Sequence, residues 1–444
     1  MTAVTNAVDT PRSVTPMTWR DPALSGRLGL IRHALVQRTR ADEPPWPMAL
    51  VNAWTADGAV ASGAGINTTS EGAILAAVGE AVERYCMRAI PSGLAWSRAS
   101  DLSGRVLGPG SWPMFTDEQY AYREFPYRRF DDDERHWTTA RSLTTDETVW
   151  IPASLVWLRD EWPEGKLTAG LSTGSASHPL LEQAQVTSLY EAIQGDAVSI
   201  SWESRATVPK LDPLAPWQAP TVVEAARNAA LAGVDLVLRD ITTDLGVPAV
   251  IAVLHDRRGR RPALAVGSAC RATIKAACEK ATLEAVHALS WMRDEFFLRP
   301  DCDYDTALAE AARPDDMVAH GFLYGFAEAV ENAAHLVGDE PKREPAHPHG
   351  FEGPLTSPRV ELDAIVRRLV ESGLDPLWVD LTTRDVAPMG FRACRAVVPG
   401  LVHLSVGRWS RHLGNPRIAA VPNRVGWPHE GSLRYDAGLP HPLS

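Results

Sequence analysis

The sequence Gly-Glu-Ala-Val-Glu-Arg at residues 79–84 lies in an alanine-rich stretch whose apolar periodicity predicts a helix over residues 69–87. Positions three and four apart share one face of a helix. Glu80 and Glu83 therefore project together, and Arg84 follows one turn after Glu80.

Two further stretches repeat this pattern of an acidic residue, an alanine and a β-branched residue. They are Tyr-Glu-Ala-Ile-Gln at residues 190–194 and Leu-Glu-Ala-Val-His at residues 283–287. Converging carboxylates repel one another unless a cation lies between them, so three such helices would suit a magnesium ion and the phosphates that it carries. An alternative interpretation is that each helix displays ordinary i,i+4 ion pairs toward solvent, as Lys280 and Glu284 would.

Small-residue segments precede the acidic stretches. Ser-Gly-Ala-Gly at residues 62–65 lies in a predicted turn over residues 59–67, Gly-Leu-Ser-Thr-Gly occupies residues 170–174, and Gly-Ser occupies residues 267–268. Such turns bring backbone N–H groups close to phosphate oxygens. The order of motifs therefore predicts a nucleotide enzyme without a P-loop.

Composition excludes several classes of protein. The chain has 444 residues, of which 45% are hydrophobic and 22% charged, as in a globular protein with a large core. The net charge of −11 disfavours a nucleic-acid partner, because duplex binding requires a concentrated basic surface. No N-terminal apolar run is long enough for a signal peptide or membrane span, so we expect a cytoplasmic protein. The five cysteines lack Cys-x-x-Cys spacing, which favours buried free thiols over zinc ligands.

The fold class predicted from the patterns is α+β, with mixed or antiparallel sheets and alanine-rich helices. We expect residues 1–20 to be disordered, residues 21–421 to form the main domain, and residues 422–444 to be an extended proline-rich tail. Helices are predicted at residues 69–87, 180–202, 272–292 and 362–372, with a helical lead-in over residues 19–40. Strands are predicted at residues 49–54, 137–142, 149–158, 234–239, 249–254, 263–266, 377–380 and 394–398.

The chain resembles the YcaO family, ATP-using enzymes that activate peptide backbone amides. The resemblance runs from about residue 50 to the C-terminus and rests on motifs in the order that the family has. The motifs are residues 62–65, Glu-Ala-Val-Glu-Arg-Tyr at 80–85, Val-Trp-Ile-Pro-Ala at 149–153, residues 170–174 followed by Glu182, Glu191 and Asp196, residues 279–284 with 293–295 beyond them, Val-Val-Pro-Gly-Leu at 397–401, and Pro-His-Pro at 440–442. The main domain is thus expected to be a YcaO-like catalytic domain whose helices line an ATP site.

The resemblance implies ATP and Mg²⁺ as cofactors and gives individual residues roles by position. The metal ligands would be Glu80, Glu83, Glu191 and Gln194. The other cofactor-binding residues would be Ser62, Gly63, Gly65, Glu182, Glu284 and Arg293. The catalytic residues would be Arg84, in contact with phosphate, and the tail residues Pro440, Pro442 and Ser444. The terminal carboxylate at Ser444, or His441, would handle a proton.

Several positions depart from the family pattern. Ala64 and Ala77 stand where many members have lysine and serine, Gln194-Gly195 replaces Glu-Arg, and His287 replaces glutamine. A glutamine oxygen can still ligate Mg²⁺, but the lost charge should weaken a second metal. These departures leave open a catalytically silent scaffold subunit.

The expected substrate is a ribosomally made precursor peptide. A Cys, Ser or Thr side chain that attacks the amide gives an azoline, a peptide amine gives a macrocyclic amidine, and an external sulfide gives a thioamide. The proline-rich tail favours azoline formation, with amidine formation as the runner-up. Only about fifty residues precede the first motif. We therefore expect a separate leader-binding partner or direct peptide recognition, and a homodimer.

Overall fold

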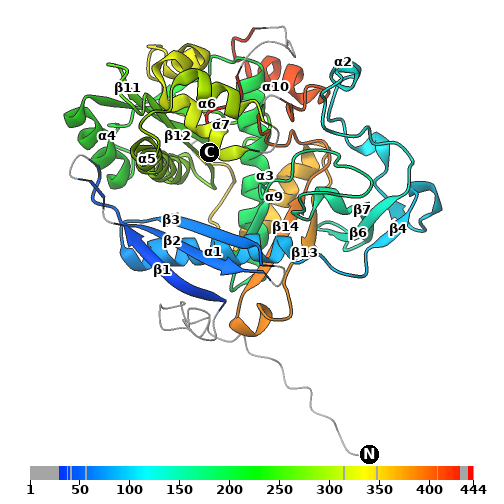
Figure 1. Cartoon of the computed structure of the whole chain (residues 1–444). Helices are drawn as coiled ribbons and strands as arrows, with labels where there is room; N and C mark the ends of the chain where they lie inside the picture. Colours follow the sequence, from blue (N-terminus) through cyan, green and yellow to red (C-terminus); the bar gives the residue numbers. More distant parts are fainter. Residues whose placement is uncertain are drawn as a thin grey trace, which may run out of the picture.

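Three sheets with long helices packed against them make up the part of the chain that the structure describes (Figure 1). The structure is a computed structural model, and it describes residues 30–37, 39–40, 43–55, 58–313, 316–346, 349–407, 409–430 and 439–443. The architecture is mixed α+β, as the sequence predicts. The segment predicted to be disordered, residues 1–20, lies outside the described residues.

The first sheet is an antiparallel meander followed by a helix. Its strands are β1 (Ile31–Gln37), β2 (Met48–Trp54) and β3 (Val60–Ile66), paired in that order. The helix α1 (Ser70–Arg88) packs against β3 and β2. The helix predicted over residues 69–87 is thus confirmed.

Two other predictions in this region are wrong. The lead-in predicted as a helix over residues 19–40 contains the strand β1, because residues 31–37 gain a hydrogen-bonded ladder against β2; residues 19–29 lie outside the described residues. The segment 59–67, predicted as a glycine-rich turn, contains the strand β3.

The glycines of β3 let α1 lie directly on the strand. A Cβ at Gly63 would lie 2.0 Å from the carbonyl oxygen of Ala77 and 2.4 Å from the nitrogen of Ala81. A Cβ at Gly65 would lie 2.4 Å from the carbonyl oxygen of Ala73. Because these contacts are to helix backbone, only glycine fits at either position.

The second sheet repeats this arrangement. Its antiparallel strands are β9 (Lys210–Leu211), β10 (Val234–Asp240), β11 (Ala249–Asp256) and β12 (Leu264–Cys270), with the helices α4 (Pro220–Ala232) and α5 (Ile274–Leu298) packed against it. A Cβ at Gly267 of β12 would lie 2.3 Å from the nitrogen of Ala285 on α5. A three-stranded meander followed by an acidic helix therefore occurs twice.

The third sheet is joined to the second by a long helix. Its strands, in spatial order, are β5 (Arg105–Val106), β7 (Thr148–Pro152), β6 (Arg135–Ser142), β13 (Leu377–Asp380), β14 (Arg392–Val397) and β8 (Ser175–His178), with β4 (Ala95–Ser97) beside β6. The helix α3 (Leu181–Glu203) contacts β14, β8 and α9 (Pro358–Glu371), and also contacts β12. Figure 1 shows α3 in the middle of the molecule.

Short helices complete the described structure. They are α2 (Asp117–Ala121), α6 (Tyr304–Ala311), α7 (Met317–Phe322), α8 (Ala334–Val337) and α10 (Arg417–Val425). Because α10 includes Pro422 and ends at Val425, the extended tail predicted over residues 422–444 starts too early. Pro422 has no N–H to donate within the helix, and the burial of Ile418 and Val421 offsets the free-energy cost of that missing hydrogen bond.

The five cysteines are buried and free, as the sequence predicts. Burial raises the pKa of the Cys86 thiol to about 11 and that of Cys278 and Cys394 to about 12. In the described ranges, no helix combines the length and the hydropathy that a membrane span requires.

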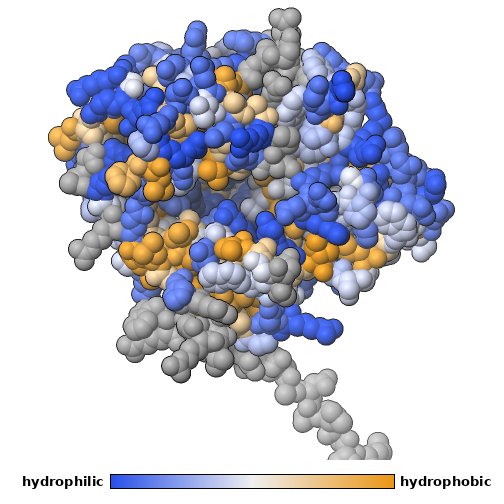
Figure 2. Space-filling view, in the orientation of Figure 1, coloured by the Kyte–Doolittle hydropathy of each residue, from blue (hydrophilic) through white to orange (hydrophobic). Residues whose placement is uncertain are grey.

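Exposed apolar side chains gather on the outer face of the first sheet (Figure 2). Leu35 of β1 lies opposite Leu50 of β2, and both are exposed, as is Val60 of β3. The neighbouring Val51 points the other way and is buried. This sheet therefore has one face in the core and one apolar face toward solvent.

The substitution Gly63→Ala is expected to destabilise the protein by about 3 kcal/mol, because the added methyl must displace helix backbone. The matched control is Gly79→Ala on α1, where a Cβ would meet nothing closer than 3.6 Å. That change should be neutral or stabilise by up to about 1 kcal/mol. Urea unfolding of both variants checks this expectation, and equal stabilities would contradict it.

Candidate active site

Glu80 and Arg84 of α1 are tied to the backbone of β3. A carboxylate oxygen of Glu80 accepts a hydrogen bond from the N–H of Ala64 at 2.6 Å. Arg84 forms an ion pair with Glu80 at 2.5 Å and donates to the carbonyl oxygen of Ser62 at 2.9 Å. The motif at residues 62–65 therefore positions the acidic helix through its backbone.

Glu83 of α1 and Glu191 of α3 are crowded carboxylates. Burial raises the pKa of Glu83 well above its usual value, and the charges of Glu191 and Glu80 raise it further. Burial also raises the pKa of Glu191 to about 7, although Arg271 and the N–H of Gly174, at 3.3 Å, lower it. Carboxylates from two helices thus lie close enough to interact electrostatically, and the nearby cations do not offset the cost of their burial.

This donor set fits a magnesium ion. Mg²⁺ prefers oxygen ligands and takes one or two protein carboxylates, with water and nucleotide phosphates completing its coordination. Among the described residues, no group of three or more His, Cys, Asp or Glu side chains could hold a metal ion by itself. We call Glu80, Glu83 and Glu191 the carboxylate cluster; beside it, a nucleotide and water would have to supply the remaining oxygen ligands of a magnesium ion.

Gln194 and Glu284, also predicted as cofactor ligands, have partners of their own. The amide of Gln194 donates to the hydroxyl of Ser268 on β12 at 2.7 Å. Glu284 of α5 forms an ion pair with Lys280 and lies 3.9 Å from Nδ1 of His287. Burial alone would raise the pKa of Glu284, but Lys280 and His287 outweigh it and hold the pKa well below its usual range. Glu284 thus already has its counter-charge.

Two arginines near the cluster did not emerge from the sequence. Arg395 of β14 lies near Glu83 and Glu191, and burial lowers its pKa to about 10 although both carboxylates oppose this. Arg271 follows β12, and its charge lowers the pKa of Glu191. A charged residue inside the otherwise apolar run at residues 393–398 was the available signal for Arg395.

Glu182 and Arg293 lie further along the acidic helices. Glu182 is in the first turn of α3, nine residues before Glu191, or about 13 Å along the helix. Arg293 is nine residues beyond Glu284 on α5 and forms an ion pair with the buried Glu43 at 2.7 Å. Their roles in nucleotide binding stay predictions.

Residues 440–443 of the tail are buried against their own chain. The hydroxyl of Tyr324 donates to the carbonyl oxygen of Pro440 at 2.5 Å, and Trp202 of α3 donates to that of Leu439 at 3.3 Å. The ring of His441 lies 4.4 Å from that of His320, centroid to centroid. Pro442 belongs to this docked segment, and Ser444 lies outside the described residues. The catalytic role given to the tail stays a prediction.

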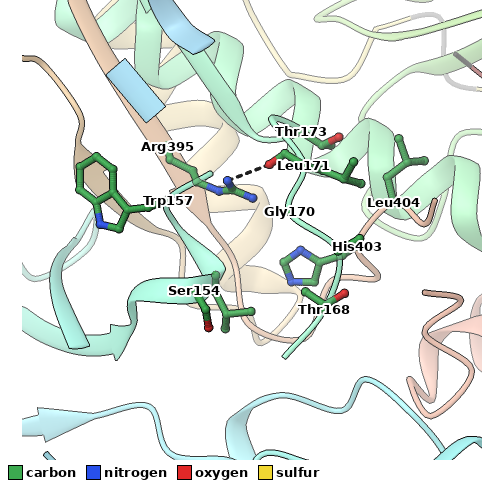
Figure 3. Close-up of a pocket in the computed structure, with 11 residues that line it drawn as sticks. Ser154, Trp157, Thr168, Gly170, Leu171, Thr173, Arg395, His403 and Leu404 are labelled. Carbon is green, nitrogen blue, oxygen red and sulfur yellow. Dashed lines mark hydrogen bonds between the residues drawn. The ribbon is translucent and has the colours of Figure 1, made fainter. Parts of the chain in front are cut away.

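A small pocket adjoins the carboxylate cluster. Its walls come from residues 154–157, residues 168–173, Arg395 and residues 403–404 (Figure 3). An adjoining hollow extends it to Ala192 and Gly195, the residues that follow Glu191 and Gln194 on α3.

Sequence comparison identifies the family. The family model described as YcaO cyclodehydratase, ATP- and Mg²⁺-binding, matches residues 64–402. An uncharacterized protein of Methanothermobacter thermautotrophicus is 32% identical over 370 residues, which cover 79% of this chain and 84% of that protein. The chain therefore belongs to the YcaO family, whose cofactors are ATP and Mg²⁺.

Solved structures share the fold. A heterocyclase in complex with substrate and cofactor is 20% identical, with a TM-score of 0.75, over 94% of this chain and 56% of that chain. YcaO from Methanopyrus kandleri bound with AMPPCP and Mg²⁺ is 20% identical, with a TM-score of 0.61, over 84% of this chain and 86% of that chain. This chain thus spans little more than half of the heterocyclase.

The substitution Glu83→Gln is expected to stabilise the metal-free protein by about 1–2 kcal/mol at pH 8, because a carboxyl whose pKa rises on folding lowers the stability above its unfolded pKa, whether it is buried as a charge or takes up a proton. Urea unfolding in EDTA measures this. The same variant should lose the rise in Tm that Mg²⁺ and a non-hydrolysable ATP analogue give the wild type. Glu224→Gln, at an exposed position of α4, is the control and should change neither quantity. A Glu83→Gln protein less stable than wild type in EDTA would contradict the expectation.

Docking of the tail is expected to weaken in acid. Burial lowers the pKa of His441 to about 4 and that of His320 well below its usual value. The unfolded chain, in which the pKa is about 6.5, binds more protons between pH 6.5 and pH 4, so these histidines cost stability as the pH falls through that range. The raised pKa values of Glu83 and Glu191 act in the opposite direction.

The contribution of His441 is therefore measured as a difference between variants. Between pH 7 and pH 5, His441→Gln should lose less unfolding free energy than wild type, by about 1 kcal/mol or more. His33→Gln, at an exposed position of β1, should behave as wild type. An equal pH dependence in His441→Gln and wild type would show that this histidine does not control docking.

Proposed function

We propose that this protein uses ATP and Mg²⁺ to activate a backbone amide of a ribosomally made precursor peptide, converting Cys, Ser or Thr to an azoline. The observation that carries the proposal is the electrostatic contact between the buried Glu83 and the partly buried Glu191, carboxylates on two helices whose raised pKa values favour a cation beside them. Membership of the YcaO cyclodehydratase family supports the same reaction class.

We assign separate roles to the residues of this site. Glu80, Glu83 and Glu191 would hold the metal, and Arg84 and Lys280 would offset charge on the phosphates. When bound, ATP would supply the γ-phosphoryl group that makes the amide oxygen a leaving group, and ADP would be released. The burial of Glu83 strengthens these charge interactions, because it lowers the local dielectric constant.

The proposed reaction balances as a loss of water from the peptide. The thiol sulfur of Cys, or the hydroxyl oxygen of Ser or Thr, bonds to the carbonyl carbon of the preceding amide. The carbonyl oxygen leaves as phosphate, the nucleophile and the amide nitrogen each lose a proton, and a C=N bond forms. Macrocyclic amidine formation and thioamidation use the same activation with a different nucleophile, which the carboxylate cluster does not select.

A second candidate is a silent scaffold subunit of a peptide-modifying complex. Gln194 donates to Ser268, and Glu284 already has Lys280 as its counter-ion. Both observations favour a weakened second metal site. In either role we expect a precursor peptide as ligand, recognised directly or through a separate leader-binding protein, and a homodimeric assembly.

Intact-mass and fragmentation analysis of the peptide encoded beside this gene tests the reaction after incubation with protein, ATP and Mg²⁺. Loss of water localised to a Cys, Ser or Thr is the expected result, and Glu224→Gln should match the wild type. Glu83→Gln should lower turnover at least about 100-fold, because a metal ligand is lost. Loss of water that joins an amine to a distant carbonyl would establish the amidine instead. An unchanged peptide, together with no Mg²⁺-dependent ATP binding, would favour the scaffold.

A further inference from the structure

Arg395 has donors that the protein does not use. Its Nη1 donates to the carbonyl oxygens of Val156 at 3.0 Å and Leu171 at 2.9 Å. Within the described residues, its Nε and Nη2 make no hydrogen bond, not even to Glu83 or Glu191. Neither nitrogen is among the fully buried polar atoms that lack a partner, so each keeps some contact with solvent although the residue is buried. A guanidinium has five N–H donors, so three are available to a ligand.

Those donors belong to a residue that lines the small pocket. Figure 3 shows Arg395 and His403 among the residues that line this pocket. Burial, with the charges of His412 and Arg395, lowers the pKa of His403 to about 3, so its ring is neutral and can donate one hydrogen bond. The hydroxyl of Thr173 also lies in the lining and has no hydrogen-bond partner in the described parts of the chain.

The lining suits a small, singly charged anion. The space is sufficient only for a group of a few atoms, and Trp157 and Leu404 supply apolar walls. A carboxylate can accept two parallel hydrogen bonds from a guanidinium, which fixes its orientation. The nearby charges of Glu83 and Glu191 disfavour a dianion such as phosphate more strongly than a monoanion.

We propose that this pocket, between Arg395 and His403, binds a carboxylate of the peptide substrate. The inference rests on the proposed function, because it concerns the same substrate. The carboxylate is either an Asp or Glu side chain or the C-terminal carboxylate of the peptide. The pocket continues to Ala192 and Gly195 on α3, so a carboxylate held there places neighbouring amides beside the turn that carries Glu191. Arg395 is thus a specificity-determining residue that selects which amide reaches the cluster.

Binding of short capped peptides to the full chain, measured by calorimetry without ATP, tests the pocket. The probes are acetyl-Gly-Ala-Asp-amide, its Asn counterpart, and acetyl-Gly-Ala-Gly with a free carboxylate. At least one carboxylate peptide should bind about tenfold more tightly than the Asn peptide. Preference for the Asp peptide identifies a side chain as the ligand, and preference for the free C-terminus identifies the chain end. Tighter binding of inorganic phosphate than of either carboxylate peptide would overturn the proposal.

Substitutions inside and outside the pocket show where the carboxylate binds. Arg395→Lys, which keeps the charge but loses the paired donors, should weaken carboxylate binding about tenfold. Thr173→Val keeps the shape of the lining and should also weaken it. Arg392→Met, at an exposed position of the same strand, is the matched control and should leave binding unchanged. Equal weakening by Arg392→Met would overturn the proposal.

A separate titration with a non-hydrolysable ATP analogue and Mg²⁺ distinguishes a failure of the pocket assignment from a failure of the proposed function. Absence of carboxylate binding with nucleotide binding intact overturns only the pocket assignment. Absence of nucleotide binding overturns the proposed function as well.

Discussion

The arrangement of the candidate site depends on how closely α1 lies on β3. Gly63 and Gly65 have no Cβ, so the backbone of the helix contacts the strand directly. At that separation the side chains of Glu80 and Arg84 reach the peptide groups of the strand. A wider spacing would leave these two side chains to solvent and would move Glu83 relative to α3. The close packing of α5 on Gly267 provides the same constraint for the second meander.

Much of the fold could be predicted because helix periodicity and β-branched runs dominate the local sequence. The helix predicted at residues 180–202 is α3, and the strand predicted at residues 377–380 is β13. The predictions of secondary structure were wrong where pairing with a distant segment decides the structure. The glycines of β3 indicate a turn when read locally, whereas their purpose is contact with a helix that follows them. Likewise, β1 exists because β2 lies beside it.

Local sequence patterns could only indicate candidate site residues, one helix at a time. Glu80 and Glu83 share a helix face, and the repeated motif pointed to Glu191. The structure adds that Glu284 already has Lys280 as a partner, so the three acidic helices are not equivalent. Arg395 and the pocket around it combine segments far apart in the chain, and no local pattern places residues 154–157 beside His403. The contacts of Pro440 with Tyr324 and its neighbours are long-range in the same way.

Burial of the cysteines is expected to make the folded protein react slowly with thiol-specific reagents. A thiolate is the reactive form, and burial holds the pKa of Cys86, Cys278 and Cys394 far above neutral pH. Cys270 and Cys302 are buried as well. A maleimide or iodoacetamide added to the folded protein together with a cysteine-containing peptide would therefore label the peptide almost alone. Consumption of peptide thiols could then be followed optically, in real time, against a nearly blank background.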